Sequence, residues 1–144
     1  MAIVIVPPII FLIAAGPPAI LTLMVLLAAF FGLREFYHLT LPKSIWIERW
    51  MGMGLGLILS IIISHGDTKI VFPFFVLLLL FLSILFMGTS QNLSSAISNM
   101  GIMIFGIFYI GFLLPHVSLI RNLVDGKQWV LFLIATVWAG DISA

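Results

Sequence analysis

The sequence predicts an all-α integral membrane protein, a polytopic bundle of helices with five or six membrane segments. Of its 144 residues, 63% are hydrophobic and only 8% are charged, and the mean hydropathy is +1.33. A soluble domain has about 25% charged residues, so this chain could not cover its surface in water. Apolar runs close to the roughly 20 residues that span a bilayer alternate with short polar stretches. These two observations predict the fold class.

The same composition excludes several classes of function. A formal net charge of +1 leaves no basic stripe for a nucleic acid, so no nucleic-acid partner is expected. The chain has no cysteine, which rules out disulfides, thiolate metal sites and thiol catalysis. Residues 1–15 contain no Lys or Arg, whereas a secretory signal begins with a basic region. We therefore expect this run to be a first membrane helix.

The first two apolar runs are separated by prolines. Residues 1–15 contain a Pro-Pro pair and end at a Gly-Pro-Pro sequence, and proline disfavours helix at the residue before it. This run is shorter than a full span, so it forms either a short tilted span or one half of a broken hairpin. A second run, residues 17–33, ends at Arg34 and Glu35. A polar stretch, residues 34–49, follows.

Three further spans and a last segment follow in order. The spans are expected over residues 46–64, 70–87 and 96–114, and the last segment begins near Gln128. Trp46 and Trp50 are placed as aromatic residues at the membrane interface. The breaks are a polar turn at 65–69, an uncharged loop at 88–95, Pro115 with His116, and a loop at 121–127. No Asp, Glu, Lys or Arg occurs from Ile70 to Ile120.

The distribution of basic residues indicates a topology. Arg34, Lys43 and Arg49 make the first loop the most basic, which favours a cytoplasmic position. Alternation then places the 88–95 loop inside and the 121–127 loop outside. Because the basic residues inside and outside balance, the cytoplasmic assignment rests on the usual dominance of early loops.

Two local patterns favour structural roles. Gly52 and Gly56 form a G-x-x-x-G pattern, which lets two helix backbones approach closely in lipid and is favoured over a phosphate loop. Arg34 and Glu35 are interpreted as interface anchors, with the arginine snorkelling and Tyr37 in the aromatic belt, rather than as contacts to a substrate.

The three histidines lie far apart in sequence and match no metal-binding spacing. His38, His65 and His116 are therefore expected to be interfacial, or hydrogen-bonded within the bundle. His116 follows Pro115 and can bond a backbone carbonyl that the proline leaves without a partner.

Asp141 is the strongest candidate for a functional residue. It is the only charged side chain in the apolar segment that follows Gln128. Thirteen residues of helix from Gln128 correspond to about 19 Å, and a carboxylate at such depth costs roughly 2.5–3.5 kcal/mol on insertion scales. Intramembrane acids are functional by default. A carboxylate suits Mg²⁺, which one or two carboxylates hold together with substrate phosphates.

Three segments resemble one enzyme family. Residues 33–39 (LREFYHL) resemble the glutamate-aromatic segment that follows the first spans of phosphatidate cytidylyltransferases, the CDP-diacylglycerol synthases. Residues 108–114 (FYIGFLL) resemble their penultimate span before a short loop. Residues 138–144 (WAGDISA) resemble the start of their tryptophan-alanine-x-aspartate helix and are the most specific match. The resemblance covers residues 1–144 in order.

The resemblance implies transfer of a cytidylyl group from CTP to phosphatidate, which gives CDP-diacylglycerol and pyrophosphate in phospholipid biosynthesis. It implies that Asp141 is catalytic and binds metal, with Mg²⁺ as the cofactor. It also suggests a bacterial inner membrane and a homodimer.

The family's later segments are absent from the sequence. These are a tyrosine and a glycine-arginine segment, a lysine-rich loop, and the long signature that carries a second metal-binding aspartate. We therefore expect residues 1–144 to be the N-terminal membrane portion of such an enzyme, inactive by itself. The alternatives are a small transporter or channel subunit in which Asp141 relays an ion or proton, and a non-catalytic membrane scaffold.

Overall fold

The computed structural model describes residues 16–66, 68–89 and 92–143 and shows a bundle of long helices. No strand occurs in these ranges, which confirms the all-α class. The elements in chain order are α2 (Pro18–Thr40), η1 (Lys43–Ile45), α3 (Trp46–Ser64), α4 (Thr68–Thr89), α5 (Leu93–Gly106), η2 (Ile107–Leu113), α6 (His116–Arg121) and α7 (Gly126–Ser143).

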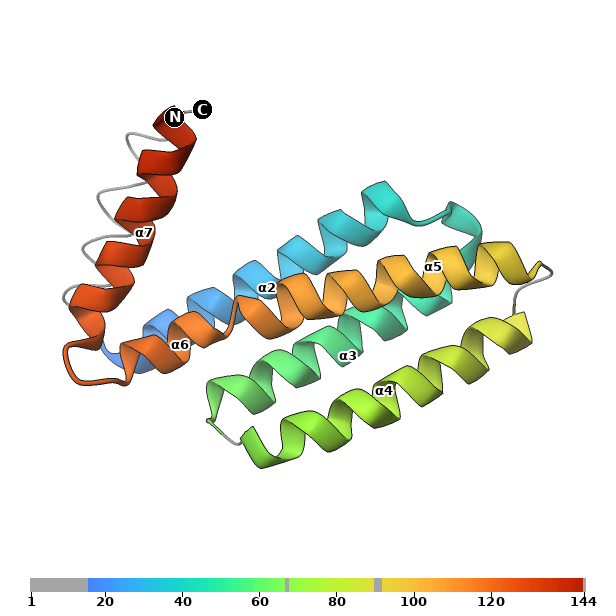
Figure 1. Ribbon diagram of the computed structural model, residues 1–144, viewed down its shortest axis with the longest axis horizontal. Coiled ribbons are helices and arrows are strands. Elements are labelled where there is room, and N and C mark those ends of the chain that lie inside the picture. Colours follow the sequence, from blue (N-terminus) through green and yellow to red (C-terminus); the bar gives the residue numbers. More distant parts are fainter. Residues whose placement is uncertain (1–15, 67, 90–91, 144) are drawn as a thin grey trace.

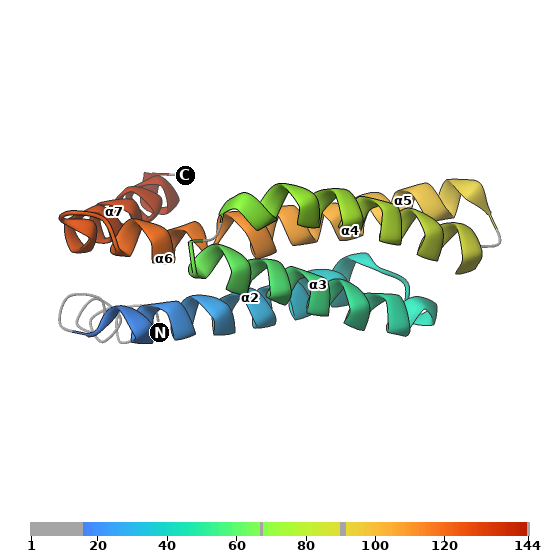
Figure 2. The same cartoon turned by 90° about the horizontal axis from the view of Figure 1, so that it is seen from below.

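The long helices run in a common direction and form two layers. In Figure 2, α2 and α3 make one layer while α4 and α5 make the other. Within the described ranges, four stretches are long and apolar enough to cross a membrane: Pro18–Thr40, Lys43–Ser64, Lys69–Gly88 and Leu93–Arg121. The first predicted segment, residues 1–15, lies outside the described ranges. These four stretches, with α7 as a shorter helix, account for the other predicted segments.

The connections place the chain's polar stretches at two opposite ends of the bundle. The turn from α2 to α3 and the connection from α4 to α5 lie at one end, while the α3–α4 turn and the α6–α7 loop lie at the other (Figure 1). This arrangement agrees with the alternation predicted from the sequence. At the α3–α4 turn Gly66 adopts a φ of +79°, which a side chain would strain.

Two predicted boundaries were wrong. The polar stretch does not begin as a loop at Arg34, because α2 continues to Thr40. Nothing breaks the helix before Pro42, and η1 begins immediately after that residue. Pro115 does not end the fourth span either, since α6 resumes at His116 and the stretch continues to Arg121.

The core lies between α2, α3, α4 and the α5–η2 helix. Its largest fully buried side chains are Tyr37, Phe86, Leu33, Leu59, Leu82, Met103 and Ile107. Gly52 and Gly56 are both buried in α3, where a Cβ on Gly56 would lie 2.6 Å from Leu33. A Cβ on Gly52 would lie 3.0 Å from Met103. The predicted close helix packing at the G-x-x-x-G pattern is therefore confirmed.

Two side-chain hydrogen bonds to backbone carbonyls stabilise the end of the bundle where α6 lies. Arg121 is only 8% exposed, and its Nη2 donates a hydrogen bond of 3.2 Å to the carbonyl of Gly16. His116 Nδ1 lies 2.7 Å from the carbonyl oxygen of Phe112, and its ring stands edge-on to the ring of the same phenylalanine. His116 therefore bonds a backbone carbonyl near Pro115, but not the one that the proline leaves without an i+4 donor: that carbonyl belongs to Gly111 and accepts a bond from Ser60 instead.

Candidate functional site

Asp141 lies in the last turns of α7. The helix follows the α6–α7 loop at the end of the bundle where α2 begins, and in Figure 1 it points away from the four long helices instead of running beside them. The depth of about 19 Å predicted for Asp141 assumed that its helix runs parallel to the other spans. The described residues do not include the side chain of Asp141, so its catalytic and metal-binding roles stay predictions.

An apolar groove separates α7 from the bundle. It has a volume of about 310 Å³. Its walls come from α2, α7 and the chain around α6, and include Leu21, Met24, Val25, Val117, Val130 and Trp138. These walls offer hydrocarbon surface to a lipid tail but no charged group to a phosphate or a metal ion.

The described side chains contain no ready-made metal centre. Among them, no three His, Asp or Glu residues come close enough together to hold a metal ion. A magnesium ion held by Asp141 would therefore need its remaining oxygen ligands from outside this set of side chains, for example from substrate phosphates.

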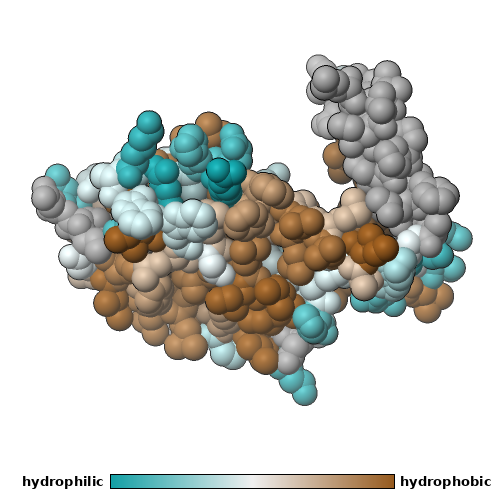
Figure 3. Space-filling view, turned by 180° about the vertical axis from the view of Figure 1, so that it is seen from behind, coloured by the Kyte–Doolittle hydropathy of each residue, from teal (hydrophilic) through white to brown (hydrophobic). Residues whose placement is uncertain are grey.

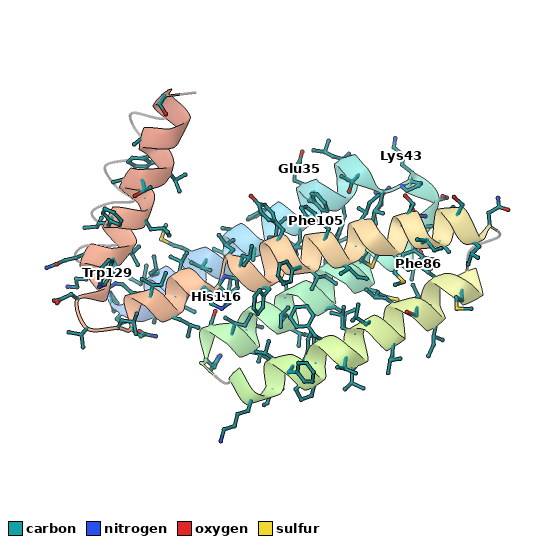
Figure 4. All side chains as sticks on the ribbon, in the orientation of Figure 1. Glu35, Lys43, Phe86, Phe105, His116 and Trp129 are labelled. Carbon is teal, nitrogen blue, oxygen red and sulfur yellow. The ribbon has the colours of Figure 1, made fainter. Side chains whose placement is uncertain are left out.

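A second pocket opens between α2 and α3, and we call it the α2–α3 pocket. It has a volume of about 210 Å³. Its lining residues are Arg34, Tyr37, His38, Trp46, Arg49, Trp50 and Met53. Figure 3 shows hydrophilic side chains gathered at this end of the bundle, and Figure 4 shows Glu35 and Lys43 projecting from the same end. The pocket thus joins cationic, aromatic and apolar groups in one concave site.

Arg49 connects the pocket to the fold. Its Nη2 donates a hydrogen bond of 2.6 Å to the carbonyl of Leu41, the residue that follows α2. Its Nε is buried without a partner among the described residues. A guanidinium has five N–H donors, so the bond to Leu41 leaves most of its capacity for hydrogen bonding unused.

The role predicted for Tyr37 was wrong. Tyr37 does not stand in an aromatic belt, because its side chain is fully buried and its Oη donates a hydrogen bond of 2.8 Å to the carbonyl of Met103. The ring fits against Gly106, where a Cβ would lie 2.6 Å from the tyrosine Cε1. Tyr37 therefore forms the inner wall of the pocket and holds α2 against α5.

Sequence reasoning did not find the α2–α3 pocket. Arg34 was interpreted as an interface anchor, whereas the structure places it with Arg49 and His38 around one cavity. The feature of the sequence that could have indicated the pocket is the pair of tryptophans, Trp46 and Trp50, close to these basic residues.

The first family-like segment lies against the helix that carries the second. A Cβ on Gly32, next to the first segment, would lie 3.4 Å from Ile110 in the second. The rings of Phe36 and Phe105, which precedes the second segment, have centroids 5.9 Å apart. The first segment therefore packs along the helix that carries the second.

The sequence model of the cytidylyltransferase family matches residues 1–144. The chain belongs to the cytidylyltransferase family. Neither a curated protein nor a solved structure gave a significant match. The family match confirms the resemblance found in the three segments, and it supports a CTP-using transferase built on membrane-spanning helices. It favours this class over the transporter or channel alternative.

Proposed function

We propose that this cytidylyltransferase-family protein takes part in the transfer of a cytidylyl group from CTP to phosphatidate, giving CDP-diacylglycerol and pyrophosphate. The observation that carries the proposal is the family match over residues 1–144, in a chain whose described residues include four stretches suited to a membrane. CTP is water-soluble, but an enzyme embedded in lipid has direct access to a lipid acceptor. A lipid phosphate such as phosphatidate presents a nucleophilic oxygen at the membrane surface.

Asp141 is the residue we assign to the reacting phosphates. A carboxylate is an oxygen ligand of the kind that Mg²⁺ takes in proteins, where one or two carboxylates act together with substrate phosphates. When bound, the ion would neutralise charge on the triphosphate of CTP. The contribution of this chain is to present the carboxylate on a helix, where it holds the cation and thereby orients the nucleotide.

The cellular setting follows from the same proposal. Substrates from both the lipid and the aqueous phase suit a bacterial inner membrane, with the first loop and the nucleotide on the cytoplasmic side. We also propose a homodimer, with no nucleic-acid partner. The apolar surfaces of α4 support burial in lipid, because large side chains such as Phe72, Ile84 and Met87 are more than 70% exposed.

The test is a transfer assay on the purified protein. The purified protein in detergent micelles is incubated with labelled CTP, Mg²⁺ and phosphatidate, and lipid-soluble label is identified as CDP-diacylglycerol. UTP, ATP and GTP serve as nucleotide controls. Label incorporated into a different lipid phosphate would reject phosphatidate as the acceptor, and no label in any lipid would reject the transferase.

A further inference from the structure

We propose that the α2–α3 pocket binds the phosphate of an anionic membrane lipid. This inference rests on the pocket's geometry and charge, and it does not depend on the acceptor assigned above. The site is separate from Asp141 in the fold, because α7 joins the bundle at the end opposite the α2–α3 turn (Figure 1).

The position of the pocket indicates that its ligand is a lipid. It lies where one candidate span, Pro18–Thr40, ends and the next, Lys43–Ser64, begins. Trp46 and Trp50 border it with 61% and 56% of their surfaces exposed, and tryptophan is enriched at the level of the lipid headgroups. The pocket therefore opens into the layer that contains lipid phosphates.

The positive charge of the residues that line the pocket favours an anionic ligand. Arg34, Arg49 and His38 contribute basic groups, and none of the described residues that line the pocket is acidic. Arginine presents a planar fork of donors that matches phosphate oxygens and forms charge-assisted hydrogen bonds. Arg34 is exposed and makes no ion pair with any side chain that the structure describes, so its guanidinium is available to a ligand.

The size of the pocket fits a phosphate group. A cavity of about 10–15 Å³ by the same measure holds one water molecule, so 210 Å³ has room for a phosphate with its ester oxygens. Tyr37 and Met53 are buried beneath it and close its inner side. The headgroup can therefore enter from the membrane surface, while the acyl chains remain in the surrounding lipid.

The test measures lipid retention by native mass spectrometry of the purified full chain in neutral detergent. Phosphatidylglycerol is the anionic probe, because its phosphodiester cannot accept a cytidylyl group and its binding is therefore distinct from substrate turnover. Phosphatidylcholine is the neutral comparison. We expect phosphatidylglycerol to be retained preferentially, and Arg34→Gln to weaken its binding about tenfold through loss of one charge-assisted contact.

Lys127→Gln is the matched control. It removes one exposed positive charge at the opposite end of the bundle and should change retention less than twofold. Equal retention of the two lipids, or equal losses in Arg34→Gln and Lys127→Gln, would overturn the proposal. Displacement of the lipid by millimolar CTP or inorganic phosphate would also overturn it, since the pocket would then be a site for soluble phosphates. Unchanged helix content by circular dichroism shows that Arg34→Gln still folds.

Discussion

The Oγ of Ser60 in α3 donates a hydrogen bond of 3.0 Å to the carbonyl oxygen of Gly111 in η2. Four residues after Gly111, Pro115 has no N–H to offer to that carbonyl. The same hydroxyl lies 2.8 Å from the carbonyl oxygen of Gly56, so its single proton is shared between a bond within α3 and a bond across the helices. The helices approach closely here, because a Cβ on Gly111 would lie 2.9 Å from the Gly56 oxygen.

Gly111→Ala should destabilise the fold because the added methyl group meets backbone atoms of α3, which cannot rotate away. We expect a loss of about 1–3 kcal/mol, the usual range for inserting a methyl group into a packed site. The free energy of unfolding in mixed micelles, titrated with a denaturing detergent, measures this loss.

Gly54→Ala is the control for that substitution. A Cβ on Gly54 would meet no atom within 4 Å, so the gain in helix propensity, up to about 1 kcal/mol, should leave stability equal or higher. Equal losses in both variants would contradict the close backbone contact between Gly111 and Gly56.

Tyr37→Phe should destabilise the protein by about 1 kcal/mol, because it removes the buried bond from Oη to the Met103 carbonyl while keeping the ring. Tyr109→Phe is the matched control, since Tyr109 is 58% exposed and should lose little. The difference between the losses of unfolding free energy in the two variants measures the contribution of the buried hydrogen bond to stability. A larger loss in Tyr109→Phe would mean that α2 is not held to α5 in this way.

Single cysteines can test the proposed topology, because the chain contains none of its own. Ser44→Cys in η1 and Asn92→Cys before α5 lie at one end of the bundle, while Val124→Cys lies in the α6–α7 loop at the other. An impermeant maleimide added to intact cells should label Val124→Cys and leave the other two unlabelled until the cells are opened. Labelling of Ser44→Cys in intact cells would reverse the orientation.

Asp141→Asn should reduce CTP-dependent transfer by at least about a hundredfold, because the amide cannot supply the negative charge that a metal ion requires. Asp125→Asn is the comparison, since Asp125 is an exposed loop residue. The transfer assay at saturating CTP and raised Mg²⁺ measures both variants. Full activity in Asp141→Asn would remove Asp141 from the reacting site.

The ends of a helix could be predicted well from the sequence where polar residues flank an apolar run on both sides. The span expected at residues 46–64 coincides with α3, because a polar stretch precedes it and a polar turn follows it. Arg34 misled the prediction, since a charged residue does not by itself end a helix. Pro115 misled it for a related reason: the chain bends into α6 and continues, with Ser60 bonded to the Gly111 carbonyl.

The α2–α3 pocket could not be predicted in the same way. In water, apolar residues mark the face that packs inward, but a membrane helix is apolar toward lipid and toward its neighbours alike. The sequence of α2 therefore did not show that Tyr37 faces α5 while Leu39 is exposed. Asp141 could be recognised from the sequence as a candidate functional residue, because inserting a carboxylate among apolar residues costs free energy in any orientation of the helix.

The π-helical geometry of Ile107–Leu113 has a consequence for the chain that follows it. A π turn accommodates an extra residue relative to an α turn, and each residue of an α-helix turns the chain by about 100°. Deleting one residue from this segment would remove the extra residue and return the segment to α-helical winding, so α6 and α7 would keep their direction. The same deletion in the α-helical part, Leu93–Gly106, would rotate everything downstream by roughly 100°, and Arg121 would turn away from Gly16. The wide turn therefore gives the chain a tolerance of one residue before the helix that carries Asp141 changes direction.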